Sequence, residues 1–150
     1  MRRPSWLAAF ALVPLGLLAC GCSRPPSARV RGQVLLDGRP LAGAAVQFWP
    51  KDDLELGVYS GKAGPDGTFE LQGRDGNRVK PGRYIVVISR NVKKDGTLPT
   101  KEDDQMALAA PGALRNTLPV KYSDRNNPPF TVEVKVGDNR LPPFEVKTRP

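Results

Sequence analysis

The stretch Pro81-Gly82-Arg83-Tyr84-Ile85-Val86-Val87-Ile88-Ser89-Arg90 decides the fold of this chain. It opens with a turn dipeptide, passes through five consecutive apolar residues, and closes on a serine and an arginine. An apolar run that is bounded by turn signals and is too short for a helix is typical of a strand buried on both faces. We therefore expect residues 81–90 to form a central strand around which weaker strands pack.

The segments before this strand predict two hairpins. Residues 29–36 alternate between apolar and polar side chains, as a half-buried strand does. Asp37-Gly38 follows and favours a two-residue turn, because glycine accepts a positive φ without a Cβ clash. The return strand is expected at residues 44–49. A second hairpin, forming an edge pair, is expected between residues 57–62 and 67–71.

The C-terminal segments predict two more strands. Residues 130–136 alternate most cleanly, and a turn is expected at residues 137–139 before a last strand within 141–147. Pro142 and Pro143 cannot donate to a ladder, so this strand should lie at an edge or begin late. The positions expected to face the core are Val30, Val34, Leu36, Ala44, Val46, Phe48, Phe130, Val132, Val134, Val136, Phe144 and Val146.

Residues 91–116 form the longest stretch without strand character. Within it, Thr100 precedes a helix-compatible segment at residues 101–110, which Pro111-Gly112 ends. Thr100 can cap this segment while Asp103 reaches back to it, and acidic residues in the first turn suit the helix dipole. We expect a surface helix of one to three turns in a long loop.

Together these segments predict an all-β protein. About seven short strands at regular spacing favour a single antiparallel β-sandwich. The 16 prolines and 15 glycines suit a chain with many turns. A length of 150 residues leaves room for one domain, expected at residues 29–148, and an export signal.

The first residues have the features of a bacterial export signal. A basic start at residues 1–3 is followed by an apolar run at 6–18 that is too short to span a bilayer. Leu17-Leu18-Ala19-Cys20 resembles the lipobox of bacterial lipoproteins. That resemblance implies cleavage after residue 19, lipid attachment at Cys20, and an exported protein anchored on the periplasmic or cell-surface side of a bacterial membrane. Cys22 is the second choice of acceptor, and residues 20–28 are expected to form a flexible tether.

The mature chain resembles the carboxypeptidase regulatory-like, or transthyretin-like (prealbumin-like), β-sandwich domains of bacterial surface lipoproteins, notably those of planctomycetes. The resemblance covers almost the whole chain in order. It implies a transthyretin-like sandwich but does not indicate a function. The matching segments are residues 30–48, Asp66-Gly67-Thr68-Phe69, Pro81-Gly82-Arg83-Tyr84 and residues 118–124.

The composition argues against the common enzyme classes. Histidine is absent, which removes the Ser-His-Asp arrangement and every zinc site built on imidazole. No glycine-rich phosphate loop precedes a helix. Two acidic clusters, Asp52-Asp53-Glu55 and Glu102-Asp103-Asp104, lack the spacing of a calcium loop and are interpreted as solvated loops. We expect a non-enzymatic protein without catalytic residues, metal or cofactor.

The remaining candidates for ligand binding are aromatic. Trp49, Tyr59 and Tyr122 could stack on a sugar, and packing in the core or at strand ends is the favoured alternative. Tyr122 is also expected to anchor the last loop to the sandwich. A carbohydrate-binding module would need Trp49 and at least one tyrosine on a common exposed face.

Charge gives a broad indication of partners. Without Arg2 and Arg3 the chain has 21 basic and 15 acidic residues, spread along the sequence. Such spacing favours a solvated surface over a nucleic-acid footprint and leaves a weak attraction to anionic lipid or polysaccharide open. The leading hypothesis is a lipid-anchored module acting in protein interaction or envelope structure, and the alternative is a cell-surface carbohydrate-binding module. The expected partners are the membrane, through the N-terminal anchor, and an unknown envelope protein or polysaccharide, but no nucleic acid.

Overall fold

The central strand of the first sheet is β6 (Gly82–Ser89), as the apolar run predicts. The computed structural model describes residues 25–149. In it, β6 lies between β3 (Ala45–Pro50) and β9 (Phe130–Val134), and β4 (Tyr59–Lys62) pairs with the other side of β3. All three pairings are antiparallel. One face of β6 packs into the core through Tyr84, Val86 and Ile88. On its other face Val87 is also buried but Ile85 is only half-buried, so the expected burial of both faces holds in part.

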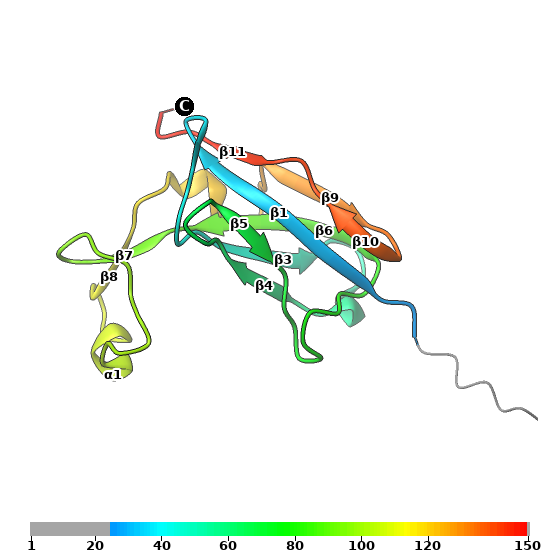
Figure 1. Cartoon of the computed structure of the whole chain (residues 1–150), viewed down its shortest axis with the longest axis horizontal. Coiled ribbons are helices and arrows are strands. Elements are labelled where there is room, and N and C mark those ends of the chain that lie inside the picture. Colours follow the sequence, from blue (N-terminus) through cyan, green and yellow to red (C-terminus); the bar gives the residue numbers. More distant parts are fainter. Residues whose placement is uncertain (1–24, 150) are drawn as a thin grey trace, which may run out of the picture.

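The second sheet is built on β1 (Ala28–Leu36), which pairs with four short strands. β2 (Arg39–Pro40) and β5 (Thr68–Glu70) pair with it in antiparallel fashion. β10 (Gly137–Arg140) and β11 (Phe144–Val146) run parallel to it. Figure 1 shows β1 crossing in front of the other sheet, with β10 and β11 along one side. The all-β sandwich is thus confirmed, and the two parallel pairings are a feature that the sequence did not indicate.

Both predicted N-terminal hairpins need correction. The turn at Asp37-Gly38 forms as expected, with φ of 50° and 79°, but its return strand is the two-residue β2. The segment expected to return, β3, belongs to the opposite sheet. The second predicted hairpin is divided in the same way, because β4 pairs with β3 and β5 pairs with β1. A Ser60–Gln72 bridge joins the two sheets at this corner.

The C-terminal segments agree with the sequence in part. Phe144 and Val146 are buried on one face of β11, which begins directly after Pro143 and lies at the edge, as predicted. The prediction for Val136 was wrong, because β9 ends at Val134 and Val136 is 66% exposed. The expected turn at residues 137–139 is instead β10. Pro142 and Pro143 separate β10 from β11, because neither has an N–H to donate to the backbone of β1.

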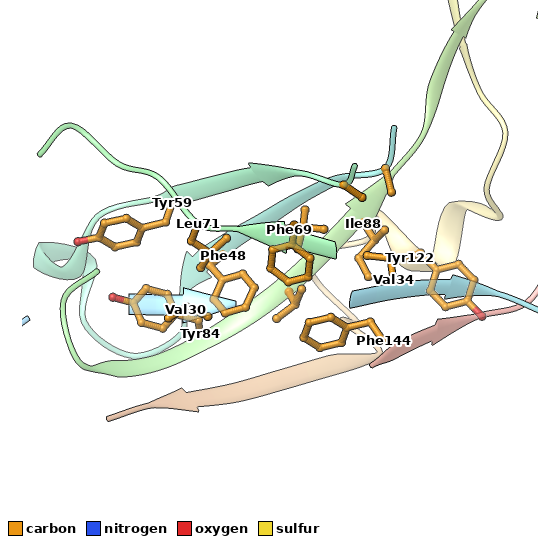
Figure 2. Packing of buried hydrophobic residues seen from close by; sticks show 14 of the residues in the cluster. Val30, Val34, Phe48, Tyr59, Phe69, Leu71, Tyr84, Ile88, Tyr122 and Phe144 are labelled. Atoms are coloured by element: carbon orange, nitrogen blue, oxygen red, sulfur yellow. The ribbon is translucent and has the colours of Figure 1, made fainter. Parts of the chain in front are cut away.

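The core lies between the sheets and is rich in aromatic rings (Figure 2). Phe144 of β11 lies with its ring centroid 6.4 Å from that of Phe48, 6.1 Å from Phe69 and 5.1 Å from Phe130. The cluster therefore joins β3, β5, β9 and β11. The buried residues of the described part run from Ala28 to Val146, so a chain that begins after Cys22 retains this entire core and every strand.

The remaining elements are short. They are the 3-10 turns η1 (Leu54–Leu56) and η2 (Val120–Tyr122), the strands β7 (Asn91–Lys93) and β8 (Leu114–Asn116), and the one-turn helix α1 (Gln105–Leu108). The length of the helix lies within the predicted range, but it begins later than expected, with Asp104 as its N-cap. Thr100 and Asp103 do contact each other, ahead of the helix. None of the helices within residues 25–149 is long and apolar enough to cross a membrane.

Candidate interaction surface

The structure places two of the three predicted aromatic candidates in the interior. Tyr59 and Tyr122 are buried, with 8% and 5% of their surface exposed. Trp49 is half-buried, and the guanidinium of Arg125 lies 4.3 Å from its ring centroid. These three residues therefore do not form the common exposed aromatic face that a stacking sugar requires.

The tyrosine hydroxyl groups have structural partners. Tyr84 donates to the carbonyl oxygen of Lys80 at 2.7 Å, and the Lys80 N–H donates to the hydroxyl of Tyr59 at 3.1 Å. Burial raises the pKa of Tyr84 well above its ordinary value. The Lys147 N–H donates to the hydroxyl of Tyr122 at 2.9 Å, so Tyr122 ties the last segment to the sandwich as expected.

Both acidic clusters are engaged in local structure. Asp52 forms an ion pair with Arg83 at 2.8 Å, and Asp53 accepts a hydrogen bond from the Glu55 N–H at the start of η1. Asp104 caps α1, accepting from the N–H of Met106 at 2.9 Å. These carboxylates complete turns and a helix terminus and do not converge on a common point.

Little in the described part of the chain suggests reaction chemistry. Across residues 25–149 no three Asp, Glu, Cys or His side chains gather as a metal ion would need. In the same residues, every buried side-chain nitrogen or oxygen has a hydrogen-bond partner. The predicted lipid-attachment residues, Cys20 and Cys22, lie outside the described residues. The absence of enzymatic activity, metal and cofactor stays a prediction.

The feature that stands apart from the sandwich is the segment of residues 91–116, called the arm below. β7 and β8 pair in antiparallel fashion, Asn91 with Asn116 and Lys93 with Leu114, and α1 lies in the connection between them. Figure 1 shows the arm projecting from the end of the sandwich opposite to the point where residues 25–28 enter β1. This geometry places the arm far from the predicted tether.

The base of the arm is attached to the sandwich by specific contacts. Arg90 donates through Nε to the carbonyl oxygen of Ala42 at 3.0 Å, and its own carbonyl oxygen accepts from the Thr117 N–H at 2.9 Å. Val92 is 1% exposed. Leu98 packs directly on Gly43, where a Cβ on the glycine would lie only 2.5 Å from the Leu98 side chain. The arm is therefore held in one position at its base.

An ion pair joins β7 to the loop that precedes α1. Lys93 Nζ lies 2.8 Å from Asp103 Oδ1, and Asp103 Oδ2 accepts from the N–H of Thr100. The hydrogen bond from Lys93, followed by that from the Thr100 backbone, lowers the pKa of Asp103 below its ordinary value. The same hydrogen bond to Asp103 raises the pKa of Lys93. Both groups stay charged at neutral pH, so the pair holds the loop that precedes α1 against β7.

The outer part of the arm is exposed and apolar. Met106 on α1 is 84% exposed. Beside it lies a hollow of about 410 Å³. Its lining has five apolar residues between Ala107 and Ala113 and three charged ones, Lys93, Lys94 and Asp95. The arm carries four basic and four acidic residues and so has no net charge. An exposed apolar tip on an ordered, neutral hairpin suits contact with another protein.

Comparison with known proteins identifies a structural neighbour only. No protein-family model matches the chain, and no curated protein matches it. The crystal structure of a DUF3823 family protein from Parabacteroides merdae is similar, with 18% sequence identity and a TM-score of 0.42. The match covers 82% of this chain and 47% of that chain, so this chain spans about half the length of that protein.

Proposed function

We propose that this protein is a non-enzymatic, lipid-anchored module of the bacterial cell envelope that contacts a partner protein through the arm. The observation that carries the proposal is the placement of the arm at the end of the sandwich opposite to the entry of β1. A chain held to a membrane before residue 28 would present the arm away from the bilayer. The neutral, apolar tip around Met106 is the surface that such a partner would cover.

The sequence before the sandwich supports the anchored location. Leu17-Leu18-Ala19-Cys20 resembles a lipobox, and two or three acyl chains on Cys20 exceed the single chain that gives only marginal membrane binding. The ordered matches in residues 30–48, 66–69 and 81–84 support a further assignment as a carboxypeptidase regulatory-like domain.

The anchor is tested by substitution of the two cysteines. Cys20→Ala is expected to move the protein from the membrane fraction to the supernatant, because each buried CH₂ of an acyl chain contributes about 0.8 kcal/mol to membrane binding. Cys22→Ala should stay in the membrane fraction and serves as the matched control. Incorporation of labelled palmitate, followed by fractionation, measures both. The reverse pattern would move the attachment site to Cys22, and membrane retention of both variants without label would contradict the anchor.

The role of the arm is tested by site-specific crosslinking in intact envelopes. A photo-crosslinking residue placed at Met106 is expected to give a discrete crosslinked species with another protein. The matched control is Val136, which is also apolar and exposed but directly precedes Gly137, the residue paired with Ala28 at the tether end. Gel mobility and mass spectrometry identify the product. Equal crosslinking from both positions, or crosslinking from Val136 alone, would contradict a contact through the arm.

A further inference from the structure

Four arginines that are distant in sequence gather on the outside of the β1 sheet near its N-terminal end. Arg29 and Arg31 occupy alternate positions of β1, so both point away from the core while Val30 is buried between them. Arg140 of β10 is the register partner of Arg31. Arg78 and Arg29 line one small hollow of about 240 Å³. These four residues are called the arginine face below.

Most guanidinium groups of the arginine face have no partner within the described part of the chain. Arg31 has one acidic partner, Glu70, at 3.5 Å through Nε. The side chains of Arg29, Arg78 and Arg140 form no hydrogen bond or ion pair with another residue of the described part. Arg31 and Arg140 lie side by side on neighbouring strands, and the single carboxylate of Glu70 offsets the repulsion between their two positive charges only in part.

The chemistry of the face favours phosphate groups. All four cations are arginines, whose planar guanidinium groups bind phosphate oxygens through two parallel hydrogen bonds. Two acidic residues lie among them, Glu70 and Asp138, so the face retains a net positive charge. A second hollow, of about 650 Å³, is lined by Arg31, Arg140 and Lys62, which adds a further cation beside the face.

The position of the face points to the source of the phosphate. Seven residues lie between Cys20 and Ala28, and the eight steps from one to the other reach at most about 29 Å when fully extended. A lipid on Cys20 would therefore hold the start of β1, with Arg29 and Arg31, close to the headgroups of the same bilayer. The neutral arm lies at the opposite end. The arginine face therefore lies at the end of the described domain that is nearest to the predicted tether.

We propose that the arginine face docks on the anionic phospholipid headgroups of the membrane that carries the protein. The inference rests on the proposed lipid anchor for its biological setting, because the tether brings the face to the bilayer. Contact between the face and the headgroups orients the sandwich and fixes the direction in which the arm extends. The face adds an electrostatic contact to the acyl anchor, and such contacts weaken as salt screens them.

The test uses the chain from Ser23 to Pro150, which lacks both cysteines but keeps the whole described core. We expect it to cosediment with vesicles made from equal parts of phosphatidylcholine and phosphatidylglycerol, and not with pure phosphatidylcholine vesicles. Arg31→Gln combined with Arg140→Gln should weaken binding by roughly tenfold to thirtyfold, because two cationic contacts are lost. Higher salt should weaken binding of the unchanged chain.

The matched control is Arg39→Gln combined with Arg115→Gln, which removes the same charge from β2 and from the arm. This control should bind nearly as well as the unchanged chain, and thermal unfolding should show that both double variants fold. An equal loss in both variants would mean that net charge alone matters and would overturn the proposal. So would the absence of binding to anionic vesicles or binding that salt does not weaken. Because this chain has no lipid, its result is independent of the palmitate experiment on Cys20.

Discussion

Phe144→Ala is expected to lower the free energy of unfolding by about 3–5 kcal/mol, because it leaves a cavity at the centre of the aromatic cluster. The side chain is 5% exposed and lies against rings from three other strands, Phe48, Phe69 and Phe130. Its nearest ring, that of Phe130, has its centroid 5.1 Å away in the opposite sheet. The substitution therefore removes contacts with Phe48 and Phe130 in the opposite sheet and with Phe69 in the same sheet.

The measurement is urea and thermal unfolding of the chain from Ser23 to Pro150. A loss of this size should lower Tm by about 10–20 °C in a domain of this length. Glu145→Ala is the matched control, since this neighbour in β11 points outward and is exposed. It should change the unfolding free energy by less than about 0.5 kcal/mol. A loss below about 1 kcal/mol for Phe144→Ala would contradict the packing described for the core.

Gly67→Ala is expected to destabilise the fold by about 3 kcal/mol, because backbone strain and a steric clash add together. Gly67 has a φ of 75°, where any Cβ is strained, and a Cβ would lie 2.5 Å from the carbonyl oxygen of Val34. That oxygen belongs to the backbone of β1 and accepts the Leu41 N–H at 3.0 Å. It cannot move aside without loss of this hydrogen bond.

Gly112→Ala separates the two contributions. Gly112 has a φ of 74°, nearly the same as Gly67, but a Cβ there would meet no atom within 4 Å. Its substitution by alanine should cost only the conformational strain of about 1 kcal/mol. Urea unfolding of both variants gives the difference. If the two substitutions cost the same, the close approach of Gly67 to β1 would not contribute to stability.

The sequence predicts which residues are buried better than which strands pair. Val86, Val87 and Ile88 are buried in β6, and Val46 and Phe48 are buried in β3, as the apolar pattern indicates. The same pattern cannot assign a strand to one of two sheets, because both inner faces of a sandwich require the same alternation. The division of both predicted hairpins between the sheets follows from this ambiguity.

The strand β10 has no signal in the sequence. Its residues Gly137-Asp138-Asn139-Arg140 contain no apolar side chain, and Gly-Asp-Asn is typical of a turn. The segment is extended because the backbone of β1 offers it a parallel partner from Ala28 to Arg31. The Asn139 side chain adds a local hydrogen bond, donating to the carbonyl oxygen of Lys135 at 2.7 Å. Pairing between distant segments therefore overrides local preference here.

The surfaces that carry the proposals are only partly predictable from the sequence. The long stretch at residues 91–116 stands out by its lack of strand character, but β7 and β8 have three residues each and too little alternation to reveal a hairpin. The arginine face has no local signal, since its members come from β1, β10 and the segment before Val79. Charges that are evenly spread along a sequence can still meet in space when β-strands bring distant segments together.

The pairing of β1 also sets the order in which the protein can be assembled. The strand is synthesised near the beginning of the chain, whereas β10 and β11, two of its four partners, come at the end. The hydrogen bond from Asn139 to Arg29 joins residues 110 positions apart. Such distant pairing slows folding, because a large loop must close before its contacts stabilise anything. We expect β4, β3 and β6 to pair first, from nearer neighbours, whereas β9 joins them late and β1 gains two of its four partners only after β10 and β11 have been made.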